Sequence, residues 1–148
     1  MVRRFKPLSV NVGKKNSSDP YDQDARKQFA FIEKEFERFV GHVEAEAAGL
    51  LESWLEFVFE KSQELVPFDT GDLKNSGYID IRMTAKGPRG EIGYAKNGFP
   101  DYAVVVHEDT TKYHEPPTQA KFLQQPVEEY TSFFEETMAE GLRVASGL

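Results

Sequence analysis

The sequence contains no cysteine and only one tryptophan among its 148 residues. The lack of cysteine excludes disulfide bonds and metal sites built from thiolates. No apolar run approaches the ~20 residues that a helix needs to cross a bilayer. The basic start MVRRFKPLSVNVGKK is followed by no apolar segment, so no secretory signal is predicted. These absences predict a protein that stays in the cytoplasm where it is made.

The composition indicates a folded chain. Hydrophobic residues make up 39% and aromatic residues 13%, with 12 phenylalanines. This content favours a packed core rich in aromatic rings over a disordered chain. The length fits one domain that buries a core of its own.

Charge is distributed unevenly along the chain. Residues 1 to 15 hold five of the 18 Lys and Arg residues and none of the 25 acids, which leaves 13 bases against 25 acids elsewhere. The acidic body is a poor ligand for duplex DNA, because that affinity comes mostly from cations that meet phosphates. The basic start can touch nucleic acid or an acidic partner, or it is a solvated terminus.

The first 25 residues are predicted to form an extended arm. They show no sustained period, but three apolar residues alternate, which suits a strand that lies against another surface. That surface need not belong to the same subunit. The residues expected to make assembly contacts are Arg3, Arg4, Phe5, Lys6, Leu8, Val10 and Val12.

A long helix is predicted from about Asp24 to Leu65. Its apolar residues recur at steps of three and four: Phe29, Ile32, Phe36, Phe39, Val43, Ala47, Leu50, Trp54 and Val58. A straight helix of this size, roughly 60 Å, exceeds a compact domain. Either Gly41 or Gly49 marks a bend, or the helix projects and packs on a neighbouring subunit. Further apolar residues off the stripe favour the projection: Leu51, Leu55, Phe57 and Phe59.

The rest of the chain predicts a small sheet followed by a helix. Strands are expected at residues 77–83, 91–95 and 101–108, joined as an antiparallel meander with the third strand central. A polar loop over residues 109–118 leads to a short helical piece over about 119–124. Pro126 is expected to open the longer C-terminal helix as its first residue. The predicted fold class is therefore α+β: a long N-terminal helix, a three-stranded antiparallel sheet and a C-terminal helix. Residues 26–148 are expected to form one α+β domain after the arm.

The stretch VPFDTGDLKNSG, residues 66–77, joins the long helix to the sheet and is called the corner below. Asp69 suits the N-cap of a short helical turn, and Leu73 is expected to point inward. Gly77 suits a left-handed end to that turn. The several glycines and the lysine of a phosphate-binding loop are missing. The corner is therefore predicted to be structural rather than catalytic.

The pair His107 and Glu108, with His114 in the loop, is the strongest candidate for chemistry. Imidazole and carboxylate are sound zinc ligands. The two histidines are not one helical turn apart, as a metalloprotease would need, and no nucleophile motif is present. Paired polar residues at a strand end are the preferred interpretation. The alternative is a small metal-dependent hydrolase that uses His107, Glu108 and His114. No enzyme activity, metal or other cofactor is predicted.

The corner and two later segments resemble small tailed-bacteriophage proteins of the tail-component, minor capsid or head–tail connector (neck) type. The shared pattern is V-P-x-D-T-G-x-L-x-x-S, then Y-A-x-x-V-H-E, then K-F-L, and the resemblance spans about residues 26–135. By this resemblance the fixed corner and interface positions are Pro67, Asp69, Thr70, Gly71, Leu73, Ser76, Tyr102, His107, Glu108, Phe122 and Leu123. The arm is longer than in the family, and Pro126 interrupts the last helix.

The resemblance implies a structural virion protein at the head–tail junction. Such a protein forms a homo-oligomeric ring, commonly six- or twelve-fold, around the DNA channel. Its expected partners are head-closure or adaptor proteins on the portal side and tail-terminator or tail proteins below, with DNA only as passing cargo. A regulatory module that recruits an acidic partner through the arm is a third alternative.

Overall fold

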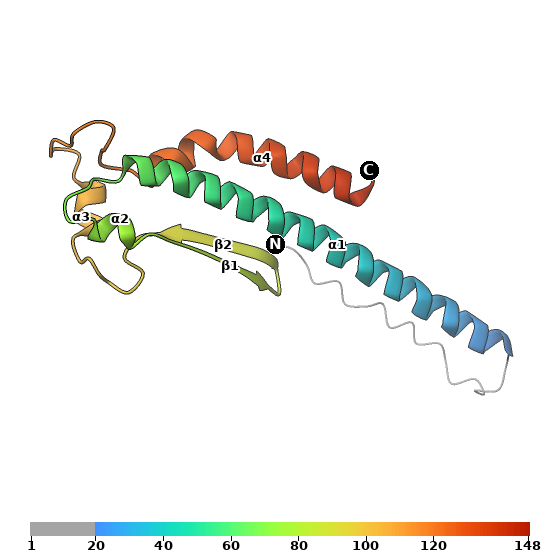
Figure 1. The fold of residues 1–148 in the computed structure, drawn as a ribbon. Helices are drawn as coiled ribbons and strands as arrows, with labels where there is room; N and C mark the ends of the chain where they lie inside the picture. Colours follow the sequence, from blue (N-terminus) through green and yellow to red (C-terminus); the bar gives the residue numbers. More distant parts are fainter. Residues whose placement is uncertain (1–19) are drawn as a thin grey trace.

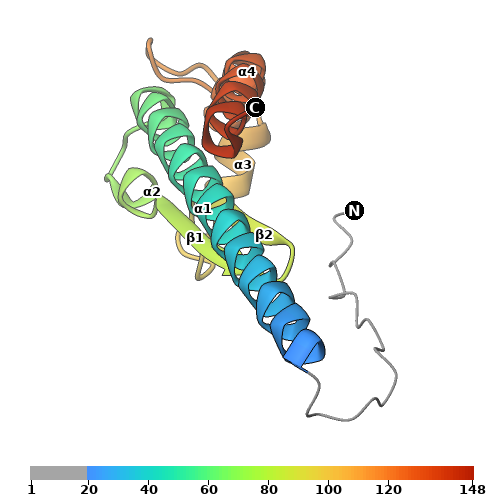
Figure 2. The same ribbon diagram turned by 90° about the vertical axis from the view of Figure 1, so that its right-hand side faces the viewer.

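The computed structural model describes residues 20–148, which form an elongated α+β fold (Figure 1). Residues 1–19, including the predicted arm contacts from Arg3 to Val12, lie outside the described residues. The elements are α1 (Pro20–Leu65), α2 (Asp72–Asn75), β1 (Tyr78–Thr84), β2 (Gly87–Gly93), α3 (Ala103–Glu108) and α4 (Gln124–Ser146). Helix α1 lies between α4 on one side and the β1–β2 hairpin on the other (Figures 1 and 2).

Helix α1 is a single element of 46 residues, about 69 Å long at ~1.5 Å per residue. It begins at Pro20, earlier than predicted and before the expected end of the arm at residue 25. Proline suits a first helical position, because its missing N–H needs no partner there. The helix continues through Gly41 and Gly49, so of the two alternatives, a bend or a projection, the structure has the projection: the N-terminal half of α1 extends beyond the other elements (Figure 1). It ends at Leu65, close to Pro67, which disfavours helical geometry at the residue before it.

The C-terminal half of α1 packs against α4 through aromatic side chains. The rings of Trp54 and Phe134 have centroids 4.5 Å apart. Farther along, Phe57 and Tyr130 meet edge to face at 4.9 Å. Gly141 of α4 lies directly on Leu50, since a Cβ atom there would be 2.4 Å from Leu50 Cδ1. The helices therefore run antiparallel, and α4 ends near the middle of α1.

The sheet contains two antiparallel strands rather than the three predicted. Ile79 pairs with Ile92, and Ile81 with Gly90. Gly90 lets β2 lie directly on α1, because a Cβ atom there would be 2.2 Å from Leu55 Cδ1. The predicted position of the first strand is close to β1, whereas β2 begins at Gly87, several residues before the predicted second strand.

The predicted central strand at residues 101–108 was wrong, because this segment forms helix α3. Backbone N–H groups of Val106 and Asp109 donate to the carbonyl groups four residues earlier, at 3.0 and 2.9 Å. The apolar run satisfies its backbone locally and buries only Ala103, while Val104 and Val105 are exposed. A short apolar run fits either a buried strand or a helix, so its period does not distinguish them.

The approach to α4 also differs from the prediction. Residues 119–123 form turns rather than a short helix, and Lys121 has a left-handed backbone with φ 58°. Pro126 is the third residue of α4 rather than the first. This position is still within the first turn, where backbone N–H groups have no partner inside the helix. The long C-terminal helix itself was predicted correctly.

Within residues 20–148, no helix combines the length and the apolar character that crossing a bilayer requires.

Candidate assembly site

The three segments that carry the family resemblance meet at one end of the molecule. Val66 and Leu73 from the corner, Ala103 from α3 and Phe122 from the turn before α4 form one buried cluster. Phe122 is 1% exposed, and its ring meets Tyr94 edge to face at 5.1 Å. Leu123 lies partly buried beside the same cluster. Segments far apart in the sequence thus fix one joint between α1, the hairpin, α3 and α4.

The short helix of the corner begins after Gly71 rather than after Asp69, which was predicted to be its N-cap. Gly71 is the N-cap of α2 and has a φ of 90°, while Asp69 is exposed and does not cap the helix, so that prediction was wrong. A Cβ atom at Gly71 would also lie 3.1 Å from the Phe68 ring. Thr70 Oγ1 donates to Asp72 Oδ2 at 2.6 Å and braces the first turn. The predicted left-handed end at Gly77 was wrong as well, because α2 ends at Ser76 in a right-handed conformation.

Ser76 ties the corner to the chain that follows the hairpin. Its hydroxyl donates to the carbonyl oxygen of Leu73 at 2.6 Å and accepts a bond from the backbone N–H of Ala95 at 3.1 Å. Pro67 is half-buried and directly follows Val66 of the cluster, just after the end of α1. These bonds hold the end of α2 against the end of β2.

His107 joins α3 to the start of α4. The backbone N–H of Gln124 donates to His107 Nε2 at 3.4 Å, and the Nδ1 atom lies 2.7 Å from Glu108 Oε1. With Nε2 as acceptor, the ring proton is on Nδ1 and is donated to Glu108. Lys121 contacts the other oxygen of Glu108, and its backbone N–H donates to the His107 carbonyl at 2.7 Å. The hydrogen bonds from Lys121 and then His107 lower the pKa of the Glu108 carboxyl.

The residues of the hydrolase alternative are occupied with structural contacts or lie apart. His107 and Glu108 serve the junction just described, whereas His114 lies in the loop that follows α3. Across the described part of the chain, no three His, Asp or Glu side chains gather in a way that would hold a metal ion. Tyr102 is likewise the N-cap of α3, not the strand residue that was predicted.

A hydrogen bond that the sequence did not indicate joins α1 to Tyr94, which packs against the buried cluster. Ser62 on α1 is 0% exposed, and its hydroxyl lies 2.8 Å from the hydroxyl of Tyr94. Burial raises the pKa of Tyr94, which keeps the phenol neutral. Ser62 had no signal in the sequence, because one serine on a helix is usually a surface residue.

The projecting half of α1 carries exposed apolar side chains. Every residue from Gln23 to Phe39 is exposed. We call the apolar face of this half the distal stripe, and its members with their exposed fractions are Phe29 (57%), Ile32 (61%), Phe36 (51%) and Phe39 (44%). Large apolar residues gathered on one exposed face mark a contact surface.

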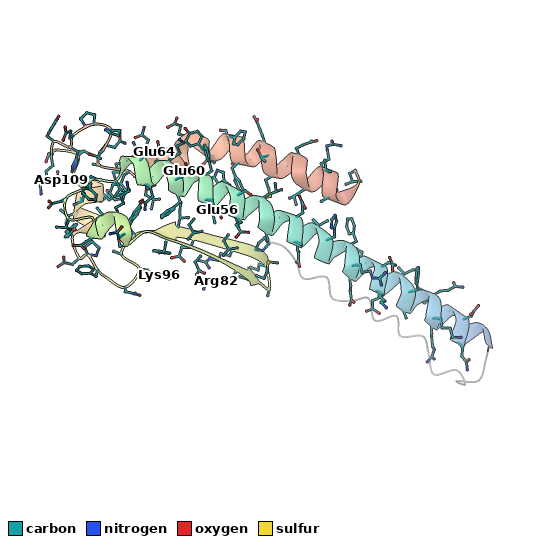
Figure 3. All side chains as sticks on the ribbon, in the orientation of Figure 1. Glu56, Glu60, Glu64, Arg82, Lys96 and Asp109 are labelled. Carbon is teal, nitrogen blue, oxygen red and sulfur yellow. The ribbon has the colours of Figure 1, made fainter. Side chains whose placement is uncertain are left out.

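A row of acids runs along the packed half of α1. Glu52, Glu56, Glu60 and Glu64 follow one another at steps of four residues and are all exposed, and three of them are labelled in Figure 3. Like charges at this spacing destabilise a helix by a few tenths of a kcal/mol per pair. Lys61 forms an ion pair with Glu64 at 3.1 Å. Apart from this one ion pair, the row adds repulsion to α1 rather than stability.

Large apolar side chains are also exposed in the corner, in α3 and in the loops before and after α3: Phe68, Phe99, Val104, Val105 and Tyr113. The sequence interpretation missed those of α3, because it had placed residues 101–108 inside a sheet.

Comparisons with protein-family models, with curated proteins and with solved structures found no match to this chain.

Proposed function

We propose that this protein is a structural virion component of the head–tail junction of a tailed bacteriophage. In this role, copies of the chain form a ring around the DNA channel and connect portal-side proteins to the tail. The observation that carries the proposal is the distal stripe, which presents Phe29, Ile32 and Phe39 to solvent on a projecting helix. A surface of this kind suits contact with a further protein chain.

The joint at the corner supports the same proposal. The three segments that resemble connector proteins are distant in the sequence, yet each contributes to the cluster of Val66, Leu73, Ala103 and Phe122. Their residues are occupied with packing and with hydrogen bonds that hold elements together. This pattern is typical of a structural part rather than of a catalytic centre, which needs reactive groups directed into a cavity.

The acid row supports placement beside DNA. Glu52, Glu56, Glu60 and Glu64 form a negative surface along one helix, and the chain carries a net charge of −7. A wall of the same sign as the phosphates repels DNA, so DNA can pass without binding.

The test is electron microscopy of particles from a parent phage that lacks this gene. Separate filled heads and finished tails are expected, with joined particles restored when the gene is supplied from a plasmid. A plasmid copy with a stop codon early in the gene is the matched control. Intact virions in the absence of the gene would refute the proposal.

A further inference from the structure

We infer that the N-terminal arm of one copy docks on the distal stripe of the next copy. This inference rests on the proposed function, since it describes how neighbouring copies in the ring are linked. The stripe supplies an elongated apolar site, and the sequence of residues 1–15 supplies a segment of matching length, apolar content and charge.

The stripe continues the face of α1 that α4 covers. Leu50, Trp54 and Phe57 face α4, and Phe39 and Val43 precede them at the same helical spacing. Helix α4 ends at Ser146, whereas α1 continues beyond the end of α4 toward its own N-terminus (Figure 1). The occupant must therefore be long, narrow and apolar on one side.

Acidic side chains line the edges of the stripe. At about 100° per residue, Glu33, Glu37 and Glu44 follow one edge, and Glu46 lies on the other. Lys27, Lys34 and Arg38 lie on the opposite side of the helix, and Arg26 is the basic exception along the first edge. The stripe thus presents an apolar centre between negative margins.

These margins disfavour the same stripe of a second copy as the occupant. Two such stripes packed antiparallel would place the Glu33 and Glu37 edge against itself, and like charges across an interface are repulsive. Residues 1–15 have the opposite character, with five bases and no acid. The bases sit close to the apolar residues Phe5, Leu8, Val10 and Val12.

The length of the arm also agrees with the length of the stripe. From residue 5 to residue 12, an extended chain spans about 23 Å at ~3.3 Å per residue. The distal stripe together with Val43, the next residue on the same face, spans about 21 Å at ~1.5 Å per residue. Residues 13–19 remain as a polar connection to the start of α1. Docking on the next copy gives the head-to-tail contact that closes a ring.

Disulfide trapping tests this inference directly, because the chain has no cysteine of its own. One tagged copy carries Val10→Cys in the arm, and a differently tagged copy carries Ile32→Cys in the stripe. Mild oxidation of the mixture is expected to give a disulfide-linked heterodimer. The matched control is Phe31→Cys, which is 65% exposed on the same helix but away from the stripe. The heterodimer yield for this control is expected to be at least about fivefold lower. The reason is that a docked arm raises the effective concentration of the cysteine at position 10 beside position 32 but not beside position 31. In 1 M salt the Ile32→Cys yield should also fall, because the Debye length shrinks to about 3 Å.

Equal yields for Ile32→Cys and Phe31→Cys would overturn the inference. A chain that carries both Val10→Cys and Ile32→Cys serves as the second test. If this chain forms a disulfide only within itself, and the mixture of single variants gives no heterodimer, the arm covers the stripe of its own copy. Docking between copies is then refuted. The result is independent of virion assembly: a heterodimer together with intact virions from the deletion phage would refute the proposed function and leave the docking contact standing.

Discussion

At the residue scale, the pairing of Ser62 with Tyr94 explains how a polar group is tolerated in the tightest part of the core. Ser62 is fully buried, and the Tyr94 hydroxyl is its described hydrogen-bond partner. The raised pKa of Tyr94 follows first from burial, since the charged phenolate would lose its hydration. A buried hydroxyl without a partner would bear the full cost of desolvation.

Tyr94→Phe is therefore expected to destabilise the protein by about 1–3 kcal/mol, because it strands the Ser62 hydroxyl without creating a cavity. Urea unfolding followed by circular dichroism measures this change. Tyr113→Phe removes a hydroxyl from a side chain that is 85% exposed and should leave the unfolding midpoint unchanged. A midpoint for Tyr94→Phe equal to that of the wild type would contradict the role of this bond.

The corner illustrates how far single residues could be predicted. The inward direction of Leu73 followed from its apolar character between polar neighbours, and Leu73 is 4% exposed. The capping role given to Asp69 failed, because the N-cap of α2 is Gly71, two residues later, with a left-handed backbone. Gly71 and Gly77, six residues apart, offered the same local signal, and of the two it is Gly71 that has the left-handed backbone, with a φ of 90°.

At the element scale, helix period was a better guide than strand pattern. The step of three and four in residues 24–65 was long enough to specify α1, and the C-terminal helix followed in the same way. The run YAVVVHE is too short for such a distinction, and α3 forms because no described strand lies beside it to pair with. Contacts between distant segments, such as Phe122 with Tyr94, had no signature in one sequence.

The contact of β2 with α1 leads to a prediction. Gly90→Ala should destabilise the protein by about 1–3 kcal/mol, since the added methyl group must displace the buried Leu55 side chain. Arg89→Ala, at the exposed neighbouring position, is the control and should change stability by less than about 0.5 kcal/mol. Thermal unfolding of both variants checks the difference, and equal melting temperatures would mean that the hairpin moves freely over α1.

The junction of α3 and α4 is expected to depend on pH. The pKa of Glu108 is lowered in the folded protein, first by its bond to Lys121 and then by His107. A lowered carboxyl pKa contributes stability above the unfolded value of ~4.3, and that contribution is lost as the pH falls through the folded pKa. The stability difference between wild type and Glu108→Gln should therefore be largest near neutral pH and shrink below about pH 4. Urea midpoints from pH 7 to pH 3 measure it, with the exposed Glu115→Gln as control. A difference that is constant with pH would contradict this assignment.

At the scale of the whole molecule, the buried core and the exposed distal stripe occupy different halves of α1. The buried apolar residues are Leu55, Val58, Val66, Leu73, Ala103 and Phe122, and each lies C-terminal to the distal stripe. The sequence predicted that α1 is too long for a compact domain. It could not decide between a bend and a projection, because a glycine in a helix permits either outcome.

Removal of residues 2–39 is accordingly expected to leave the packed half folded. The unfolding midpoint in urea should stay close to that of the full chain, since the removed residues contribute no buried apolar side chain in the described structure. The shortened gene should fail to restore joined particles to the deletion phage. Loss of cooperative unfolding would show that the projecting half contributes to folding.

The length of α1 also has a mechanical consequence. From Leu50, where α4 meets it, to Pro20 the helix extends about 45 Å. A tilt of about 5° at the packed half therefore carries the far end through about 4 Å, which is the width of a side chain. A tilt of α1 about its aromatic contact with α4 would therefore be amplified along the projecting half of the helix. A small rearrangement at the corner would become a displacement large enough to make or break a contact at the far end of α1.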